Sequence, residues 1–274
     1  MIERRILLAV LAVLILLSFF VVSCSKETGS YNLPQNALTI RQGVLTIGMV
    51  ADYPPMEYYA EDGKTLLGFD VELGKAIAGK MGLEPNFIDT SWNKLFSELQ
   101  ANRFDCIVSS VTITPAREEA YNFSKPYISN SLAMVLPRGS HIASSPEQAA
   151  NLQVGFQSGT TADEYMQDLG RYGLSFIPRM YDSMIQCFLD LQNGRIDVVM
   201  TDLLVAYEFG SYSSPFEIVW TSTEAEEFGI CIRKGRNTLT EAVNQALDEL
   251  WADGTLLQIS QETFGMDLVT SVRN

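Results

Sequence analysis

The alternation of short apolar runs with amphipathic segments limits the fold of this chain more than any other feature. Apolar runs at residues 43–50 and 106–108 predict buried strands, and residues 84–88 between them predict a further strand. Between the first two runs, Phe69, Leu73 and Ile77 recur every four residues, which predicts a helix from 69 to about 81. Strands that alternate with helices predict an α/β unit with a mostly parallel sheet.

The second half of the chain repeats this pattern. Its predicted strands are at residues 131–136, 153–156, 175–180, 198–200 and 227–232, and its predicted helices are at 162–169, 183–193, 203–209, 238–251 and 255–264. The chain has 274 residues, of which 47% are hydrophobic, so it is long enough for two domains of about 100–150 residues each. We therefore expect two α/β units.

The segment Ser109–Arg117 links the third predicted strand to a helix. Thr114 before Pro115 is a helix-start signal, because a hydroxyl N-cap and a proline at the first helical position both favour initiation. Arg117 falls in the first turn, where its charge opposes the helix dipole, so helix electrostatics does not explain it. An arginine beside backbone N–H groups and hydroxyls makes a good carboxylate site. An exposed arginine on an ordinary turn is the open alternative.

Other aromatic and polar residues also fall at the ends of predicted strands. Tyr53 stands before two prolines after the first strand, and Trp92 follows the second. Ligands of parallel sheets bind beyond the carboxyl ends of the strands, so both side chains are candidates, although packing is their commoner role. In the second half, the polar turn 157–161 suits an anion. Asp202 ends a buried strand and is either the N-cap of the next helix or a ligand for a cation.

The composition excludes several classes of function. The formal net charge is −14, which makes nucleic acid a poor partner. His141 is the one histidine, so a histidine-based zinc site or a Ser-His-Asp triad lacks parts unless His141 serves alone. Cys106, Cys187 and Cys231 lie in apolar contexts and are expected to be buried free thiols, with one disulfide and a leftover thiol as the alternative.

Residues 1–23 predict a targeting segment rather than part of the fold. Arg4 and Arg5 precede an uncharged apolar stretch that ends with a small residue before Cys24. This pattern resembles the bacterial lipoprotein cleavage box, in which the cysteine is lipidated, and an uncleaved membrane anchor is the alternative. The polar residues 24–36 predict a short tether.

Several stretches together resemble one family. They are Asp52–Pro55, Gly68–Leu73, Arg103–Asp105, Thr112–Arg117, Asn122–Tyr127, Gly159–Thr161 and Gly194–Asp197 with Asp202. They resemble the extracytoplasmic solute-binding proteins of polar amino-acid ABC importers (family 3). The resemblance implies a two-lobed periplasmic-binding-protein type II fold, with a mixed, mostly parallel sheet and flanking helices in each lobe. It implies crossing strands at about 132–136 and 228–232, a first lobe of 37–132 with 230–274, and a second lobe of 133–229.

The resemblance also implies roles for the charged residues. Arg117 would pair with the α-carboxylate of an amino acid, helped by the backbone of Thr112 and Thr161. Asp202 would take the α-ammonium, with the Thr112 hydroxyl and the backbone of Ser110. Many relatives have glycine where Ser110 stands, so its hydroxyl could add a contact.

The side chain of the ligand would meet a second group of residues. Tyr53 and Trp92 would sandwich it, and Gln157 and Ser158 would offer hydrogen bonds to a polar side chain. Thr160 of the same turn is a further candidate contact. Val50 stands where some basic-amino-acid binders carry a carboxylate, which argues weakly against arginine or lysine as ligand. We therefore expect a polar or neutral amino acid.

The expected partners are an amino acid and the transmembrane subunits of an ABC permease, with the lipid at Cys24 as the membrane contact. We expect a monomer without a cofactor, a metal or catalytic residues. The main alternative is a cyclohexadienyl or arogenate dehydratase on the same fold, against which no spare acid is evident at the centre of the site. A sensor input domain would need a further signalling segment beyond Asn274, and an adhesion lipoprotein would not need both Arg117 and Asp202.

Overall fold

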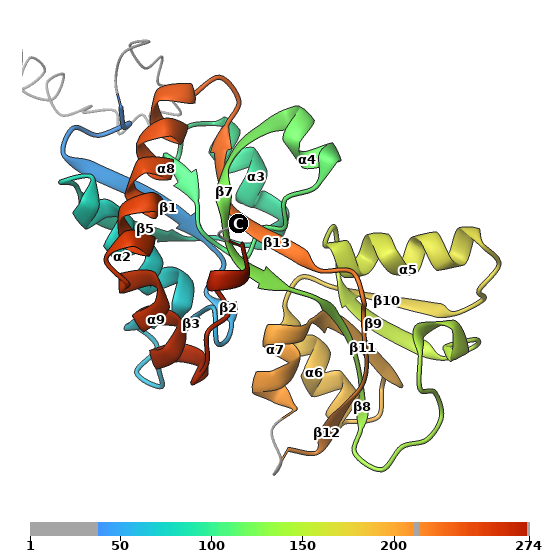
Figure 1. The fold of residues 1–274 in the computed structure, drawn as a ribbon. Coiled ribbons are helices and arrows are strands. Elements are labelled where there is room, and N and C mark those ends of the chain that lie inside the picture. The colour runs from blue at the N-terminus through green and yellow to red at the C-terminus, as the bar shows by residue number, and fades with distance from the viewer. Residues whose placement is uncertain (1–37, 211–213, 273–274) are drawn as a thin grey trace, which may run out of the picture. The chain divides into compact units, whose positions relative to one another are not determined.

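The computed structural model describes residues 38–210 and 214–272. The predicted targeting segment 1–23, Cys24 and almost all of the sequence before the first strand lie outside the described residues. The described chain forms two mixed five-stranded sheets and one small three-stranded sheet, with helices packed against both large sheets (Figure 1). The predicted α/β class is therefore confirmed.

The first sheet has the order β5 (Glu84–Asp89), β1 (Val44–Met49), β6 (Cys106–Ile107), β13 (Glu226–Arg233) and β7 (Tyr121–Asn130). Strands β5, β1 and β6 are parallel, whereas β13 pairs antiparallel with β6 and β7. Helices α2 (Phe69–Lys80), α8 (Asn237–Ala252) and α9 (Thr255–Phe264) lie together on one face, as Figure 1 shows. Helix α3 (Trp92–Gln100) packs on the other face.

The second sheet repeats this plan. Its order is β10 (Ile177–Tyr181), β9 (Gln153–Gln157), β11 (Val198–Asp202), β8 (Leu132–Pro137) and β12 (Phe216–Thr221). Strands β10, β9 and β11 are parallel, and β8 runs antiparallel to β11 and β12. Helices α6 (Met184–Gln192) and α7 (Leu203–Phe209) pack on one face, and α5 (Thr161–Arg171) packs on the other.

An aspartate at the turn before β6 and another before β11 play equivalent parts in the two sheets. Asp105 accepts a hydrogen bond from the backbone N–H of Thr46 in β1 at 2.9 Å, and Asp197 accepts one from Gln153 in β9 at 2.8 Å. In return, the backbone N–H of Asp105 donates to the Thr46 carbonyl, and that of Asp197 donates to the Gln153 carbonyl. These bonds join the start of β6 to β1 and the start of β11 to β9. They therefore fix how the parallel strands of each sheet are aligned, and with this the position of their carboxyl ends.

The chain passes between the two sheets twice. Ser131 joins β7 to β8, and residues 222–225 join β12 to β13. The two connections are bonded to each other, because Leu132 donates its N–H to Ser222 Oγ at 3.0 Å and Ser222 donates to the Leu132 carbonyl at 2.8 Å. Both connections lie just before the stretches that the sequence suggested as crossing strands. The lobe boundaries drawn from the resemblance stay a prediction.

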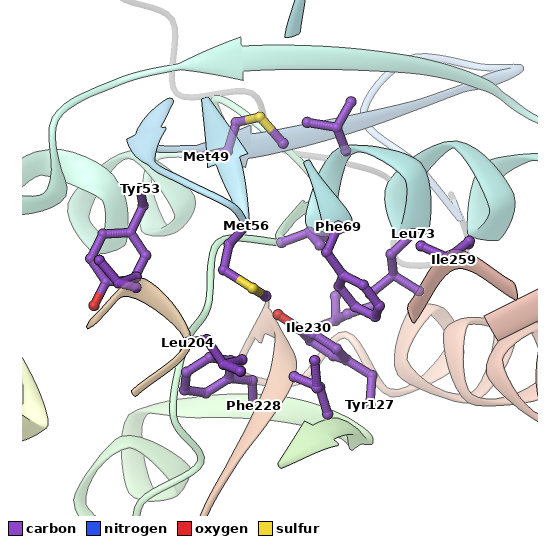
Figure 2. Packing of buried hydrophobic residues seen from close by; sticks show 14 of the residues in the cluster. Met49, Tyr53, Met56, Phe69, Leu73, Tyr127, Leu204, Phe228, Ile230 and Ile259 are labelled. Atoms are coloured by element: carbon purple, nitrogen blue, oxygen red, sulfur yellow. The ribbon is translucent and has the colours of Figure 1, made fainter. Parts of the chain in front are cut away.

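The largest apolar cluster lies between the first sheet and α2, α8 and α9, and it continues to the second sheet and its helices α6 and α7. Figure 2 shows Met56, Phe69, Tyr127 and Phe228 among its members, each at most 1% exposed. The rings of Phe69 and Tyr127 stack with their centres 6.0 Å apart. Complete burial of such side chains contributes about 1.5–3 kcal/mol each, so this cluster holds the helices on the sheet.

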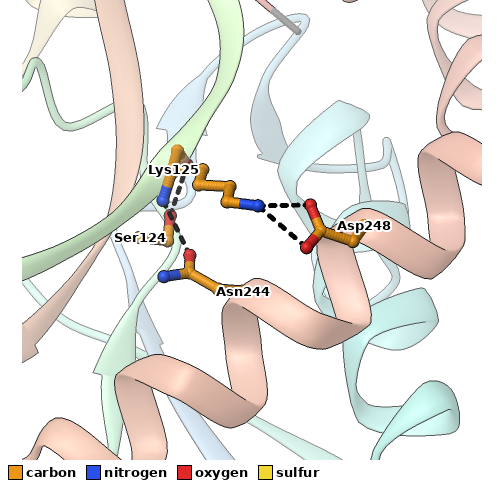
Figure 3. A network of polar contacts seen from close by, with 4 residues as sticks. All are labelled: Ser124, Lys125, Asn244 and Asp248. Carbon is orange, nitrogen blue, oxygen red and sulfur yellow. Dashed lines mark hydrogen bonds and ion pairs between the residues drawn. The ribbon is translucent and has the colours of Figure 1, made fainter.

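The last two helices return to the first sheet. Lys125 in β7 pairs through Nζ with both carboxylate oxygens of Asp248 in α8, at 2.6 and 2.8 Å, and its N–H donates to Asn244 (Figure 3). The Ser124 hydroxyl donates to the carbonyl of Lys125. Both charged side chains are about half exposed, so the pair adds little energy. It fixes where α8 lies along β7.

Several elements were not predicted from the sequence. Strands β7 and β12 were missed, as were the short strands of the small sheet, β2 (Asp52–Tyr53), β3 (Glu57–Tyr59) and β4 (Leu66–Leu67). Ser145 before Pro146 has the residue types of a helix start, but only a three-residue 3₁₀ turn, Pro146–Gln148, follows it. By contrast, helix α4 (Pro115–Ala120) begins where Thr114 predicts, and the Thr114 hydroxyl accepts from the N–H of Arg117.

Cys106, Cys187 and Cys231 are buried and form no disulfide. Burial raises the pKa of all three thiols, which keeps them protonated. Within residues 38–210 and 214–272, no helix has the length and apolar character needed to cross a membrane.

Candidate functional site

A pocket beside the carboxyl ends of the central strands brings together every binding residue predicted from the sequence. These residues are Tyr53, Trp92, Ser110, Thr112, Arg117, Gln157, Thr160, Thr161 and Asp202. The pocket contains about 370 Å³ of space not filled by atoms, part of it open to solvent. Its remaining wall is made by Val50, Asp52, Glu57 and Ser109. The role of the nine residues as ligand contacts stays a prediction.

The register of the parallel strands explains why these residues meet. Strands β1 and β6 end at residues 49 and 107, so Tyr53 and Ser110 follow the same edge of the first sheet. Strands β9 and β11 end at Gln157 and Asp202 on the second sheet. The loops after parallel strands are where ligands bind in α/β folds, and here both sheets contribute such loops to one pocket.

Arg117 is the only basic residue of the pocket wall among the described residues. Its Nη1 donates to the Thr112 carbonyl at 2.9 Å, and its Nη2 donates to the Gly159 carbonyl at 3.2 Å. The guanidinium carbon lies 5.7 Å from the ring centres of Trp92 and of Phe96. Within the described residues, no carboxylate lies within 4.0 Å of this guanidinium.

Arg117 is therefore a cation without a direct ion-pair partner among the described residues, although the more distant carboxylates of Glu164, Glu226 and Asp202 attract it. Burial lowers the pKa of Arg117, yet a guanidinium stays charged in proteins. Two carbonyls and two aromatic rings orient the group and leave some of its five N–H donors for another acceptor. A partly buried, oriented guanidinium of this kind suits a carboxylate from outside the chain.

The start of α5 lies next to Arg117. The Thr160 hydroxyl caps this helix by accepting from the N–H of Asp163 at 3.4 Å, and it donates to the Gln157 carbonyl at 2.8 Å. Gly159 adopts φ +72°, a backbone conformation that favours glycine, and this turn points its carbonyl at Arg117. The positive end of the helix dipole adds to the anion-binding character of this side of the pocket.

Asp202 supplies the opposite charge from the second sheet. It occupies the N-cap position of α7, but its side chain makes no capping hydrogen bond. It accepts instead from the hydroxyl of Tyr53 and from Asn130 Nδ2, the latter at 2.7 Å. Asn130 Oδ1 accepts from the N–H of Leu204 in the first turn of α7, so Asn130 takes over the capping role. The sequence allowed Asp202 to cap the next helix or to bind a cation. In the structure its carboxylate does not cap α7 and faces the pocket instead.

The Asp202 carboxylate titrates near neutrality. Burial is the main cause that raises its pKa to about 7, and repulsion by Glu226 adds to this. The hydrogen bonds from Tyr53 and Asn130 act in the other direction. A cation bound beside Asp202 would favour its charged form.

Ser110 takes a backbone conformation that few residues other than glycine adopt. Its φ is +50°, in the left-handed region that favours glycine. The N–H of Ser110 donates to Asp70 Oδ2 at 2.7 Å. Its hydroxyl lies 3.4 Å from Glu57 Oε2 and 3.5 Å from Asp70 Oδ2, so in this structure it contacts the protein.

Two buried acids, Glu57 and Asp70, lie behind this wall. Glu57 accepts from the Ser109 hydroxyl at 2.7 Å, and Asp70 accepts from the Tyr127 hydroxyl at 3.0 Å. Burial raises the pKa of Asp70 to about 7, and burial together with the charge of Asp70 raises the pKa of Glu57 well above its usual range. Asp70 lies in the first turn of α2, and its Oδ2 accepts from the N–H of Ser110 and from the hydroxyl of Tyr127 in β7.

Glu57 also changes one sequence-based argument. We expected no spare acid at the centre of the site, but Glu57 lines the pocket, and its raised pKa favours the neutral acid. Its position was not predictable because β3 is short and belongs to a small sheet that the sequence does not reveal.

Gln157 and Trp92 occupy the two sides of the pocket. The Gln157 amide donates to the Asp182 carbonyl at 2.9 Å, which fixes its orientation. Trp92 packs edge-on against Phe96 with ring centres 5.4 Å apart. Tyr53 is 8% exposed and holds its ring in the pocket wall while its hydroxyl reaches Asp202. The structure thus places the Trp92 ring beside Arg117 and the Tyr53 ring beside Asp202.

Sequence reasoning also missed Asn130 and Glu226. Asn130 ends β7, and Glu226 begins β13, so both lie where the chain passes between the sheets. Neither has a local sequence signal, because their position depends on the pairing of β7 with β13. Their hydrogen bonds to pocket residues make them part of the same polar network.

Comparisons with known proteins agree with this geometry. Residues 45–266 match the profile of the bacterial extracellular solute-binding proteins, family 3. The chain is 30% identical to the L-cystine-binding protein TcyJ of Escherichia coli (strain K12) over 267 residues, which is 97% of each chain. A solved structure of an ancestral arginine-binding protein bound to arginine superposes with a TM-score of 0.78 at 32% identity, covering 82% of this chain and 99% of that one.

Another solved structure bears on the enzyme alternative. The ancestral amino acid-binding protein AncCDT-1, described as a precursor of cyclohexadienyl dehydratase, matches with a TM-score of 0.73 at 29% identity. The match covers 81% of this chain and 95% of that one. The two-lobed binding-protein fold is thus shared with these structures, and the profile spans most of the described residues. This chain belongs to the bacterial extracellular solute-binding proteins of family 3.

Proposed function

We propose that this protein binds a polar amino acid in the pocket and delivers it to the permease of an ABC importer. The observation that carries the proposal is the pairing of opposite charges from the two sheets across one pocket. Arg117 has no carboxylate partner among the described residues, and Asp202 faces the pocket without a cation. A zwitterion supplies both missing charges.

The energetics support this assignment. Each charge-assisted hydrogen bond between ligand and protein contributes about 1.5–3 kcal/mol. Such bonds to both the carboxylate and the ammonium of the ligand therefore favour binding. Arg117 lies in α4, between β6 and β7 of the first sheet, whereas Asp202 ends β11 of the second sheet. A ligand held by both residues therefore favours the state in which the two sheets approach. The named relatives bind cystine and arginine, which are both amino acids.

The remaining parts of the proposal concern the membrane. The closed form would be recognised by the permease, and a lipid on Cys24 would hold the monomeric protein at the outer face of the cell membrane. The proposed lobes are residues 37–132 with 230–274, and residues 133–229. Mass spectrometry of the protein purified from a bacterial membrane tests the lipid, because a diacylglyceryl group on Cys24 adds a defined mass.

The experiment that tests binding is a thermal-shift screen of the full-length chain, purified in mild detergent, against the twenty common amino acids and cystine. A ligand that binds only the folded protein raises the melting temperature, by mass action. The proposal predicts a shift with at least one amino acid that saturates with ligand concentration. The absence of any shift, together with no heat of binding by calorimetry, would refute it.

A second candidate function is a dehydratase reaction like that of cyclohexadienyl dehydratase. Glu57 favours it, because a neutral carboxylic acid in the pocket wall can act as a general acid. Turnover of prephenate or arogenate that disappears in Glu57→Gln would support the enzyme. Binding of amino acids without turnover would support the transport protein.

A further inference from the structure

Glu226 is a partly buried carboxylate to which the zwitterion site gives no role. Its Oε2 accepts from the Thr161 hydroxyl at 3.2 Å, from the Thr112 hydroxyl at 3.4 Å and from Asn130 Nδ2 at 3.5 Å. Thr112 follows the first sheet, Thr161 begins α5 on the second sheet, and Asn130 lies at the connection. One carboxylate oxygen therefore collects donors from every part of the chain that forms the pocket.

The contact with Thr112 fixes the direction of a hydroxyl. A threonine hydroxyl has one proton and two acceptor lone pairs. Since the Thr112 proton points to Glu226, its lone pairs remain for a donor in the pocket. The donor that a zwitterion would offer there is its ammonium group.

Glu226 and Asp202 are linked through the same amide. Asn130 Nδ2 lies 2.7 Å from Asp202 Oδ1 and 3.5 Å from Glu226 Oε2. Neither carboxylate has a lysine, arginine or histidine within 4.0 Å among the described residues. Arg117 attracts both carboxylates from a distance, but burial outweighs this attraction and raises the pKa of each. The two carboxylates also repel each other, and a cation beside them gains attraction from both.

We propose that Glu226 is a second anionic partner of the ligand's ammonium, acting beside Asp202 and through the Thr112 hydroxyl that it orients. The inference rests on the proposed amino-acid binding and adds to it a residue that selects for ligands with an amine. Glu226 positions the hydroxyls of Thr112 and Thr161, which both donate to it. Its negative charge also favours ligands that carry an amine. It disfavours a ligand that has only a carboxylate, since that ligand brings no cation to offset the acidic pair.

The test compares the amino acid that binds most tightly in the thermal-shift screen with its deaminated analogue. Glutaramic acid is that analogue for glutamine, and δ-guanidinovaleric acid is that analogue for arginine. In Glu226→Gln, which keeps the size of the side chain and removes its charge, binding of the amino acid weakens by about 10-fold or more. Binding of the deaminated analogue changes by less than about 3-fold or becomes tighter, because it has no ammonium to lose a partner.

Two further variants keep the result interpretable. Glu227→Gln removes a charge from the exposed neighbour in the same strand and leaves both affinities unchanged. Glu226→Asp keeps the charge and restores part of the selectivity. Equal weakening of both ligands, or no change for the amino acid, overturns the role of Glu226 while amino-acid binding by the wild type still stands. Binding of no amino acid to the wild type overturns both proposals.

Discussion

The guanidinium of Arg117 offers the sharpest perturbation of the site, through the change Arg117→Met. Methionine keeps the length and apolar stem of the side chain and removes its charge and donors. The guanidinium now donates to the Thr112 and Gly159 carbonyls and lies over Trp92 and Phe96. Methionine can keep contact with those rings, so the packing of the pocket wall survives the change.

The expected effects on binding and on stability differ in sign. Two charge-assisted hydrogen bonds to a carboxylate contribute about 3–6 kcal/mol, so the dissociation constant rises by about 10²–10⁴-fold. In the ligand-free protein, the change removes a cation that is partly desolvated and has no ion-pair partner among the described residues. Replacing such a charge by an apolar group is neutral or stabilising, so the melting temperature is unchanged or higher.

The assay is titration calorimetry with the amino acid found in the screen, together with scanning calorimetry of the ligand-free protein. Arg171→Met is the matched control, because Arg171 is an exposed arginine of α5 that pairs with Asp168 in the same helix. It should change neither measurement by more than a few tenths of a kcal/mol. Unaltered affinity in Arg117→Met would refute the carboxylate role, and a large loss of stability would show that the guanidinium serves the fold instead.

The remaining predictions concern three other positions. Tyr53→Phe removes the hydroxyl of β2 that donates to Asp202 at the end of β11, so we expect the ligand-free protein to open. The ratio of closed to open molecules should fall by about 10-fold. Fluorescence transfer between labels on α3 and α5 measures this ratio. An unchanged transfer efficiency would contradict this. Ser110→Gly relieves a left-handed backbone and raises the free energy of unfolding by up to about 1 kcal/mol in urea denaturation, whereas a loss would show that the hydroxyl contacts matter more. Burial raises the pKa of Asp70 from 3.8 to about 7, so the folded state binds the proton more tightly than the unfolded chain. The contribution of protonated Asp70 to stability is therefore fully present below pH 3.8, the unfolded pKa, and is lost as the pH rises toward 7. In scanning calorimetry, the wild type should lose stability relative to Asp70→Asn as the pH rises through this range. A difference that grows in the wild type's favour as pH rises would contradict the assignment.

Local chemistry made much of the fold predictable. Thr114 and Pro115 fix the start of α4 by a hydroxyl cap and a preset φ, and both signals lie within the helix's first turn. The central strands were predictable because their side chains are almost wholly buried and therefore apolar, as in β1 and β11. Residues after such strands are natural candidates for a site, which is why Tyr53, Arg117 and Asp202 could be named in advance.

The strands of the two large sheets that were missed are edge strands. Strand β7 ends the order of the first sheet and β12 ends that of the second. Their side chains are only partly buried, so their sequences lack a continuous apolar run, and β7 even contains Lys125 and Pro126. Pairing with a distant strand, rather than any local preference, makes these segments extended.

Long-range contacts also decide the parts of the site that stayed open. Whether Asp202 caps a helix or faces the pocket depends on Tyr53, 149 residues away, and on Asn130, 72 residues away. Glu226 comes into the site only because two connections between the sheets lie side by side. Such contacts leave no periodicity or motif in a single sequence, so the second acid of the site could not have been predicted.

The most direct test of the central claim is a calorimetric titration of the full-length wild-type chain with three ligands that differ only at the zwitterion. They are the amino acid selected by the screen, its α-amide and its deaminated analogue. If Arg117 holds the carboxylate and Asp202 holds the ammonium, loss of either charge weakens binding by about 10²-fold or more. If either analogue binds as tightly as the amino acid, the pocket does not grip a zwitterion between the two sheets.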